Sequence, residues 1–195
     1  ALAHALFPHG VTPSPLPGES LAEATARVFS KPGDAVWFEP TFVSDGYSAR
    51  IDMMIRTGRV LELIEIKAKS FDPEEDASLW AKRGDGVASE WESYLIDVTF
   101  QTMVTRLANP GYTVVPKLCL VNLSSTSSEE ALYSKIELRE RNDADRSAPN
   151  AVFCGDAEKL KTEHLLTFVD VSEYVDHLMS DVTESAAHFL SALQN

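Results

Sequence analysis

Three ionisable side chains stand inside two stretches of sequence that otherwise have the composition of apolar strands. Within residues 61–69 (LELIEIKAK) side chains alternate between the two faces of an extended strand, so Glu65 and Lys67 project from the same face. The preceding apolar stretch carries Asp52, and the turn sequence Thr-Gly-Arg at 57–59 predicts a hairpin that folds this stretch back along the next one. Adjacent strands lie about 4.8 Å apart. The spacing therefore predicts that Asp52 comes within reach of Glu65.

Such a group of side chains suits one kind of chemistry. Two carboxylates this close repel each other unless a proton or a cation lies between them. A hard divalent ion such as Mg²⁺ or Mn²⁺ relieves the repulsion and keeps water ligands that can attack a substrate. Lys67 can orient the attacking water or stabilise the charge that develops on a scissile phosphate. The residue types and their spacing indicate metal-assisted phosphodiester hydrolysis.

A structural ion pair is the alternative for the same residues. With eight lysines and 30 acidic residues in the chain, about one acid-x-Lys triplet is expected by chance. A salt bridge from Asp52 or Glu65 to Lys67 or Arg50 would also account for the charges. Lys67 is, however, the only lysine with an acid two positions before it, and this triplet lies inside an apolar strand, where unpaired charges are costly.

The rest of the chain predicts one α/β domain that would hold these residues in place. At 195 residues, of which 44% are hydrophobic, the chain is long enough for a single sizeable core. Apolar and β-branched runs predict a mixed central sheet, and helical apolar periodicity predicts flanking helices. Strands are expected at residues 36–43, 48–56, 60–69, 113–122 and 165–169, and helices near 19–30, 90–108 and 172–193.

Two further stretches have weaker signals. Residues 132–138 are compatible with a short strand or a helix, and a polar loop follows them. Residues 71–92 are rich in acids and contain two glycines, which predicts a solvated, mobile loop that screens the site carried by the neighbouring strand.

The charge of the chain limits what it binds. A formal net charge of −13 and a pI near 4.7 oppose broad, sequence-independent binding to a phosphate backbone. Residues 50–69 are a local exception, because they contain five bases against three acids. We therefore expect weak intrinsic affinity for nucleic acid, with additional domains or protein partners delivering the substrate.

The sequence also bears on where the protein is found. No apolar run approaches the roughly 18 to 20 residues that cross a bilayer, and the first residues lack the pattern of a signal peptide. A cytoplasmic protein without a membrane segment is the expectation. The chain opens on an uncapped helical pattern without a Met, which suggests a single domain that is a fragment of a longer protein.

Three short motifs follow one another in a recognisable order: Arg-Ile-Asp at 50–52, Glu-Ile-Lys at 65–67 and Asp-Val-Thr-Phe-Gln at 97–101. The set resembles the PD-(D/E)XK nuclease superfamily, and specifically its RecB-like exonuclease branch, and it is similar to an uncharacterised bacterial domain family of that branch. In the third motif the branch has Gln-x-x-x-Tyr, whereas this chain has Gln101 followed by Thr105. Asp97, Gln101 and Thr105 share one face of the expected helix.

The resemblance implies a restriction-endonuclease-like core and a Mg²⁺- or Mn²⁺-dependent nuclease that hydrolyses DNA. It implies that the catalytic residues are Asp52, Glu65 and Lys67, the last as base or as electrostatic stabiliser. The implied metal ligands are Asp52, Glu65, the carbonyl of Ile66, and His4 in its His-Ala-Leu context. The implied substrate contacts are Gln101 and Arg50. A catalytically inactive nuclease-like module that binds nucleic acid or a protein partner is the alternative.

Overall fold

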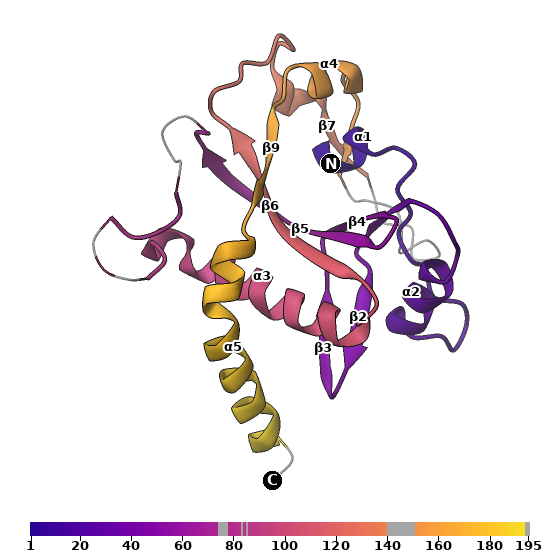
Figure 1. Cartoon of the computed structure of the whole chain (residues 1–195). Helices are drawn as coiled ribbons and strands as arrows, with labels where there is room; N and C mark the ends of the chain where they lie inside the picture. The colour runs from indigo at the N-terminus through magenta and orange to yellow at the C-terminus, as the bar shows by residue number, and fades with distance from the viewer. Residues whose placement is uncertain (74–77, 83, 85, 140–150, 194–195) are drawn as a thin grey trace.

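The computed structural model describes residues 1–73, 78–82, 84, 86–139 and 151–193, and its centre is a five-stranded sheet (Figure 1). The strands lie in the order β1-β4-β5-β6-β9. β5 and β6 run parallel, and the other neighbouring pairs are antiparallel. The predicted α/β architecture with a mixed sheet is confirmed. The bounds are β1 (Ala35–Phe38), β4 (Met53–Thr57), β5 (Val60–Phe71), β6 (Thr113–Asn122) and β9 (Leu166–Asp170).

The sheet separates two clusters of apolar side chains. Leu61 and Leu63 of β5 belong to the larger cluster together with Leu95, whereas Ile64 belongs to a smaller cluster with Ala3. Because side chains alternate along β5, this strand contributes apolar residues to the clusters on both faces of the sheet. Helices α2 (Leu21–Phe29), α3 (Ser89–Ala108) and α5 (Ser172–Leu193) contribute to the larger cluster, and α1 (Leu2–Leu6) contributes to the smaller one. Among the described residues, no helix is both long enough and apolar enough to cross a membrane.

The predicted strands 36–43 and 48–56 are wrong in their extent, because each is broken into two. The second half of the former is β2 (Thr41–Ser44), and the first half of the latter is β3 (Tyr47–Arg50). These two halves pair only with each other, as a separate antiparallel hairpin. The hairpin is thus inserted between β1 and β4 of the main sheet.

The break has a local cause at Glu39 and Pro40. Proline has no N–H to offer a sheet ladder, and Glu39 adopts a left-handed φ of 55° that turns the chain out of the sheet. On the return, the N–H of Ile51 donates to the Pro40 carbonyl, and the N–H of Glu39 donates to the Asp52 carbonyl. Asp52 therefore lies at the base of the inserted hairpin, where β4 begins.

The remaining elements are short. Residues 132–138 contain both a 3₁₀ turn and a strand, so both predicted alternatives are present in part. A second small hairpin and a short helix follow, and residues 140–150, which include the predicted polar loop, lie outside the described residues. These elements are η1 (Leu132–Lys135), β7 (Ile136–Leu138), β8 (Ala151–Phe153) and α4 (Ala157–Thr162).

Arg56 of β4 fastens the end of α2 to the sheet. Its side chain is 4% exposed. The guanidinium donates hydrogen bonds to the backbone carbonyls of Phe29, Lys31 and Gly33. It also lies 4.8 Å from the centroid of the Trp37 ring. Because it is buried, Arg56 is not among the basic residues that can contact a nucleic acid.

We expect Arg56→Lys to lower the free energy of unfolding by about 2–4 kcal/mol. A lysine ammonium does not match three carbonyls arranged around a planar guanidinium, so buried acceptors lose their donors. Urea unfolding followed by tryptophan fluorescence measures the difference. Arg59→Lys, at an exposed position of the β4–β5 turn, is the matched control and should stay within about 0.5 kcal/mol of the parent. Equal stability of the two variants would contradict the anchoring role of Arg56.

Candidate metal-dependent catalytic site

Glu65 and Lys67 meet on the side of β5 that faces α3. Glu65 is 6% exposed, and Lys67 Nζ lies 2.6 Å from Glu65 Oε1. The contact is a charge-assisted hydrogen bond, which is stronger than one between neutral groups. The shared face predicted from the alternation of side chains is confirmed.

Asp52 lies across from this pair. Met53 of β4 is the partner of Ile64 on β5, so one further step along both strands places Asp52 beside Glu65. Asp52 Oδ2 accepts a hydrogen bond of 2.8 Å from the backbone N–H of Ile66. The negative charge of Asp52 also acts on the titration of Glu65. The structure thus brings the two predicted carboxylates into electrostatic contact.

Helix α3 supplies two polar side chains, Gln101 and Asp97, one turn apart. Gln101 is 6% exposed, and its Nε2 donates to Glu65 Oε2 at 2.8 Å and to Asp97 Oδ1 at 3.3 Å. The reverse orientation of the amide would place its oxygen against two carboxylates, so the donor must face them. Asp97 Oδ2 lies 3.0 Å from Lys67 Nζ. The sequence motifs assign no role to Asp97. The one sequence feature that places it near the site is its four-residue spacing from Gln101, which puts both on the same face of the helix.

Lys67 remains protonated at neutral pH. Burial by itself lowers the pKa of Lys67, but the hydrogen bonds to Glu65 and Asp97 outweigh this effect and raise the pKa to about 12. The ammonium also lies 5.3 Å from the centroid of the Tyr94 ring. The side chain is therefore a fixed positive charge at this point of the sheet.

The two carboxyl groups carry charges that the fold disfavours. Burial is the main cause that raises the pKa of Asp52, and the Ile66 N–H and the Lys67 charge oppose it. Burial also raises the pKa of Glu65, the hydrogen bonds from Lys67 and Gln101 oppose it, and the charge of Asp52 adds to it. A cation between the two carboxylates would remove this penalty.

Two other predicted site residues, His4 and Arg50, have no contact with Glu65 or Lys67 among those that the described residues make. The His4 ring stacks on Phe38 at 3.7 Å between centroids, and burial lowers the pKa of the imidazole. Arg50 belongs to β3 rather than to β4, and its exposed guanidinium lies 3.7 Å from Glu39 Oε2. The expectation that Arg50 and Asp52 belong to one strand, 48–56, is wrong, because the chain leaves the sheet between them. Its predicted contact with substrate stays a prediction.

The described part of residues 71–92 does not behave as a solvated loop. Leu79 is 1% exposed, and its N–H donates to Tyr174 Oη at 2.9 Å. The Trp80 ring lies 4.7 Å from the Tyr174 ring and 5.0 Å from that of His177. These contacts hold this part of the segment against α5, which differs from the prediction. Residues 74–77, 83 and 85 lie outside the described residues.

The donors available to a metal are oxygens. Within the described ranges no group of three His, Cys, Asp or Glu side chains is placed to hold an ion, but a Mg²⁺ site needs only one or two carboxylates, with waters completing the shell. The β5–β6 ladder is interrupted from Ile66 to Ser70, next to the carbonyl that the resemblance assigns to the metal. Gln101 Oε1 is buried and accepts no hydrogen bond from the described residues. Two carboxylates whose charged forms are disfavoured by burial, together with the Gln101 Oε1 that accepts no hydrogen bond from the described residues, fit a hydrated hard cation.

We expect Asp52→Asn to stabilise the protein in EDTA at pH 7 to 8. Because the pKa of Asp52 is raised in the folded state, the stability that this carboxyl contributes is complete below its ordinary pKa of about 3.9 and is lost as the pH rises through the raised value. Asparagine removes the buried charge and keeps an oxygen for the Ile66 N–H. Urea unfolding should show that Asp52→Asn raises the free energy of unfolding by more than the roughly 0.5 kcal/mol that a typical surface substitution causes.

The difference in stability between the variant and the parent should narrow as the pH falls and be lost below about 3.9, where the parent carboxyl becomes protonated in both the folded and the unfolded state. Asp45→Asn, at an exposed turn, is the control without such a gain. Loss of stability in Asp52→Asn at pH 8 would mean that the charge of Asp52 holds the fold together.

Comparison of the chain with protein-family models, with curated proteins and with solved structures finds no match in any of the three. The geometry of Asp52, Glu65 and Lys67 is what supports a function.

Proposed function

We propose that this chain is a divalent-metal-dependent nuclease that hydrolyses DNA phosphodiester bonds. The observation that carries the proposal is the charge balance where β4, β5 and α3 meet. Lys67 pairs with Glu65 and Asp97, and Asp52 accepts a hydrogen bond from the neighbouring Ile66 N–H, so these three carboxylates and one ammonium have a formal charge of −2. A structural ion pair would have equal numbers of positive and negative charges, whereas an excess of two negative charges matches the charge of one divalent cation.

The roles follow from the positions of the donors. A bound Mg²⁺ or Mn²⁺ would supply Lewis-acid activation and an activated water. Asp52 and Glu65 would hold the ion, and the Ile66 carbonyl would be a third oxygen donor. The ligand role that the resemblance implies for His4 has no support from the geometry, because His4 stacks on Phe38 in the smaller cluster and no His, Cys, Asp or Glu group of three among the described residues is placed to hold an ion.

Lys67 acts as an electrostatic stabiliser of the phosphate rather than as a base. An ammonium with a pKa of about 12 has no free electron pair to accept a proton at neutral pH. Glu65 uses Oε1 for Lys67 and Oε2 for Gln101, so Glu65 would have to release one of these partners to hold an ion. Asp97 also pairs with Lys67, and it would keep the ammonium in place without Glu65.

DNA binds weakly to the chain alone. Among the bases between residues 50 and 69, Arg56 is buried, and Lys69 donates to the Glu90 carbonyl and lies 4.2 Å from the centroid of the Trp91 ring. Arg50 remains exposed for a phosphate contact. An acidic chain with so few accessible bases near its site requires a further domain or a partner to hold the substrate.

One observation favours the alternative, a nuclease-like module that binds without cleaving. Both oxygens of Glu65 already have partners, Lys67 and Gln101. A site that no longer binds metal would have its carboxylate oxygens paired with protein donors in this way. Metal binding separates the two functions, because the module would bind its partner in EDTA as well as in Mn²⁺.

We expect Mn²⁺ to raise the thermal stability of the parent protein. An ion that binds only the folded state stabilises it by about 2.7 kcal/mol at a hundredfold excess over its dissociation constant. Differential scanning calorimetry with and without Mn²⁺ measures this, and Asp52→Ala and Glu65→Ala should abolish the shift. Absence of any binding at millimolar Mn²⁺ in isothermal titration calorimetry would contradict the proposed metal-dependent function.

We expect Lys67→Met to reduce cleavage of DNA by at least about a hundredfold, the usual scale for the loss of one positioned catalytic group. Mn²⁺ affinity should stay equal or rise, because a nearby positive charge disappears. Lys69→Met, on the same face of β5 but bound to α3, is the matched control and should keep most of the activity. A folded Lys67→Met protein that binds Mn²⁺ and cuts at the parent rate rules out the assigned role.

A further inference from the structure

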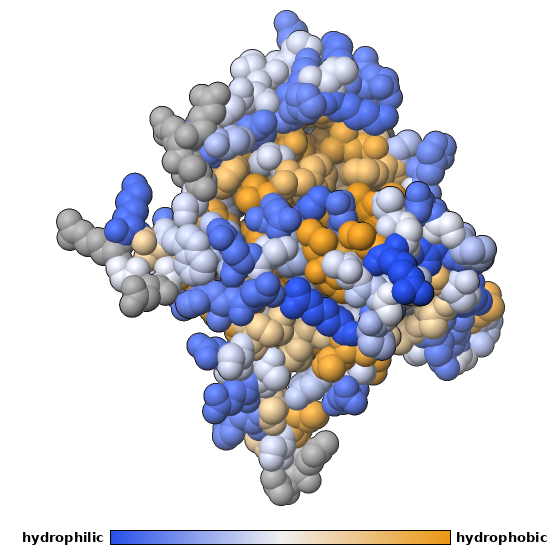
Figure 2. Space-filling model, viewed as in Figure 1, coloured by the Kyte–Doolittle hydropathy of each residue, from blue (hydrophilic) through white to orange (hydrophobic). Residues whose placement is uncertain are grey.

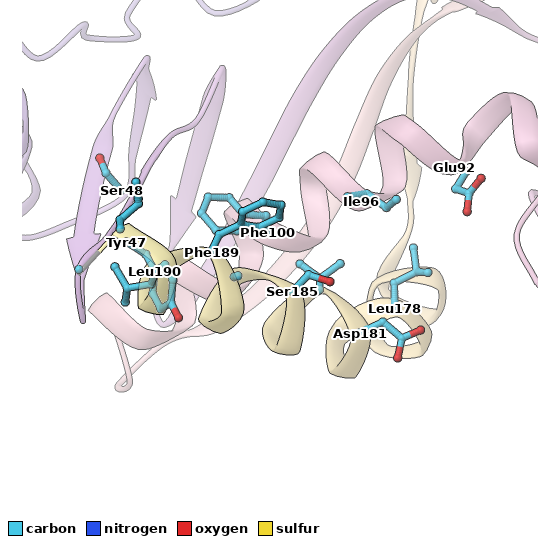
Figure 3. A pocket seen from close by; sticks show the side chains of 14 residues that line it. Tyr47, Ser48, Glu92, Ile96, Phe100, Leu178, Asp181, Ser185, Phe189 and Leu190 are labelled. Atoms are coloured by element: carbon cyan, nitrogen blue, oxygen red, sulfur yellow. The ribbon is translucent and has the colours of Figure 1, made fainter. Parts of the chain in front are cut away.

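A groove of about 640 Å³ lies where α5 runs beside α3 and the tip of the β2–β3 hairpin (Figure 3). Figure 1 shows α5 extending away from the sheet beyond the other elements. Along the groove, residues 178–193 of α5 face Ile96 and Phe100 of α3. The groove is therefore separate from the site formed by β4 and β5.

The walls of the groove are apolar and largely uncovered. Phe189 is 69% exposed, Leu193 85% and Ile96 43%. The Tyr47 and Phe100 rings meet edge to face at 6.2 Å between centroids. Figure 2 shows orange apolar residues also on this lower part of the molecule, next to blue polar ones. Large apolar side chains gathered in one concave place mark an interaction surface rather than scattered exposure.

The length of the groove favours a helix as its occupant. The α5 residues that line it, 178–193, span about 23 Å at 1.5 Å per residue. A small molecule would leave most of this length empty, whereas a helix of about 15 residues covers it. Two neighbouring helices also present ridges that a third helix can pack into.

The charge of the groove determines what kind of helix fits. Glu92 and Asp181 lie towards one end of it (Figure 3), and α5 contains four acids and no Lys or Arg. No ion pair within the described part of the chain involves Glu92, Asp181 or Glu184. A second copy would bring its own −13 charge and its own acidic α5 to this surface, which like-charge repulsion disfavours.

We infer that this groove docks an amphipathic helix of a partner protein, with an apolar stripe along its length and basic residues gathered at one end. The apolar stripe covers Phe189, Leu193 and Ile96, and the basic end pairs with Glu92 and Asp181. The inference does not depend on the proposed nuclease function, although a basic partner would also supply the affinity for DNA that this chain lacks.

The test uses a fluorescently labelled peptide of about 18 residues with leucines at helical spacing and lysines at one end. Two further peptides keep this design but carry glutamates in place of lysines, or serines in place of leucines. Fluorescence anisotropy against the parent protein should give a dissociation constant at least about tenfold lower for the basic amphipathic peptide than for either control, a difference of about 1.4 kcal/mol.

Matched variants then locate the binding. Leu193→Ser should weaken binding at least about tenfold, and Leu138→Ser, which is 84% exposed elsewhere, should not change it. Glu92→Gln combined with Asp181→Asn should weaken binding more than Glu130→Gln combined with Glu137→Gln, which neutralises two exposed acids outside the groove. Equal effects of the matched pairs would overturn the inference. So would a parent protein that is a dimer by sedimentation and becomes a monomer in Leu193→Ser, since a second copy would then fill the groove.

Discussion

A carboxylate can remain inside a sheet only when hydrogen-bond donors replace the water that it has lost, and Glu65 imposes this requirement on its surroundings. One donor, Lys67, comes from the same strand and needs only the alternation of β5. The other, Gln101, comes from α3 and lies 36 residues later in the sequence. α3 must therefore pack on β5 with one rotation about its axis, the rotation that turns Gln101 towards Glu65.

That rotation determines what the rest of α3 contacts. With Gln101 over Glu65, Asp97 lies one turn earlier and reaches Lys67. Leu95 and Val98 enter the larger apolar cluster. Positions 92, 96 and 100 form the neighbouring stripe and line the groove beside α5. A single helix thus has one side committed to polar contacts with the sheet and another left open for a partner, and a change in its packing would affect both.

The sequence predicts the parts of this arrangement that depend on local periodicity. Alternation was sufficient to place Glu65 and Lys67 together, and a short turn was sufficient to bring Asp52 opposite, because both depend on residues close in sequence. The inserted hairpin was not predicted, because the runs on either side of Pro40 both have strand propensity and the left-handed φ of Glu39 has no sequence signal. Pro40 itself was the one signal against a continuous strand. Asp97 was not assigned a role, because its partner Lys67 is 30 residues away.

The irregularity in β5 has a consequence for how this strand can vary in length. Ile66 pairs with Cys119 and Ser70 with Val121, so β5 advances four residues while β6 advances two. Two surplus residues preserve the parity of the strand, and Lys69 and Phe71 still face α3 as Glu65 does. One surplus residue would reverse every side chain after it. An insertion of two residues after Lys67 would therefore leave Phe71 facing α3, whereas an insertion of one residue would turn it to the other face of the sheet.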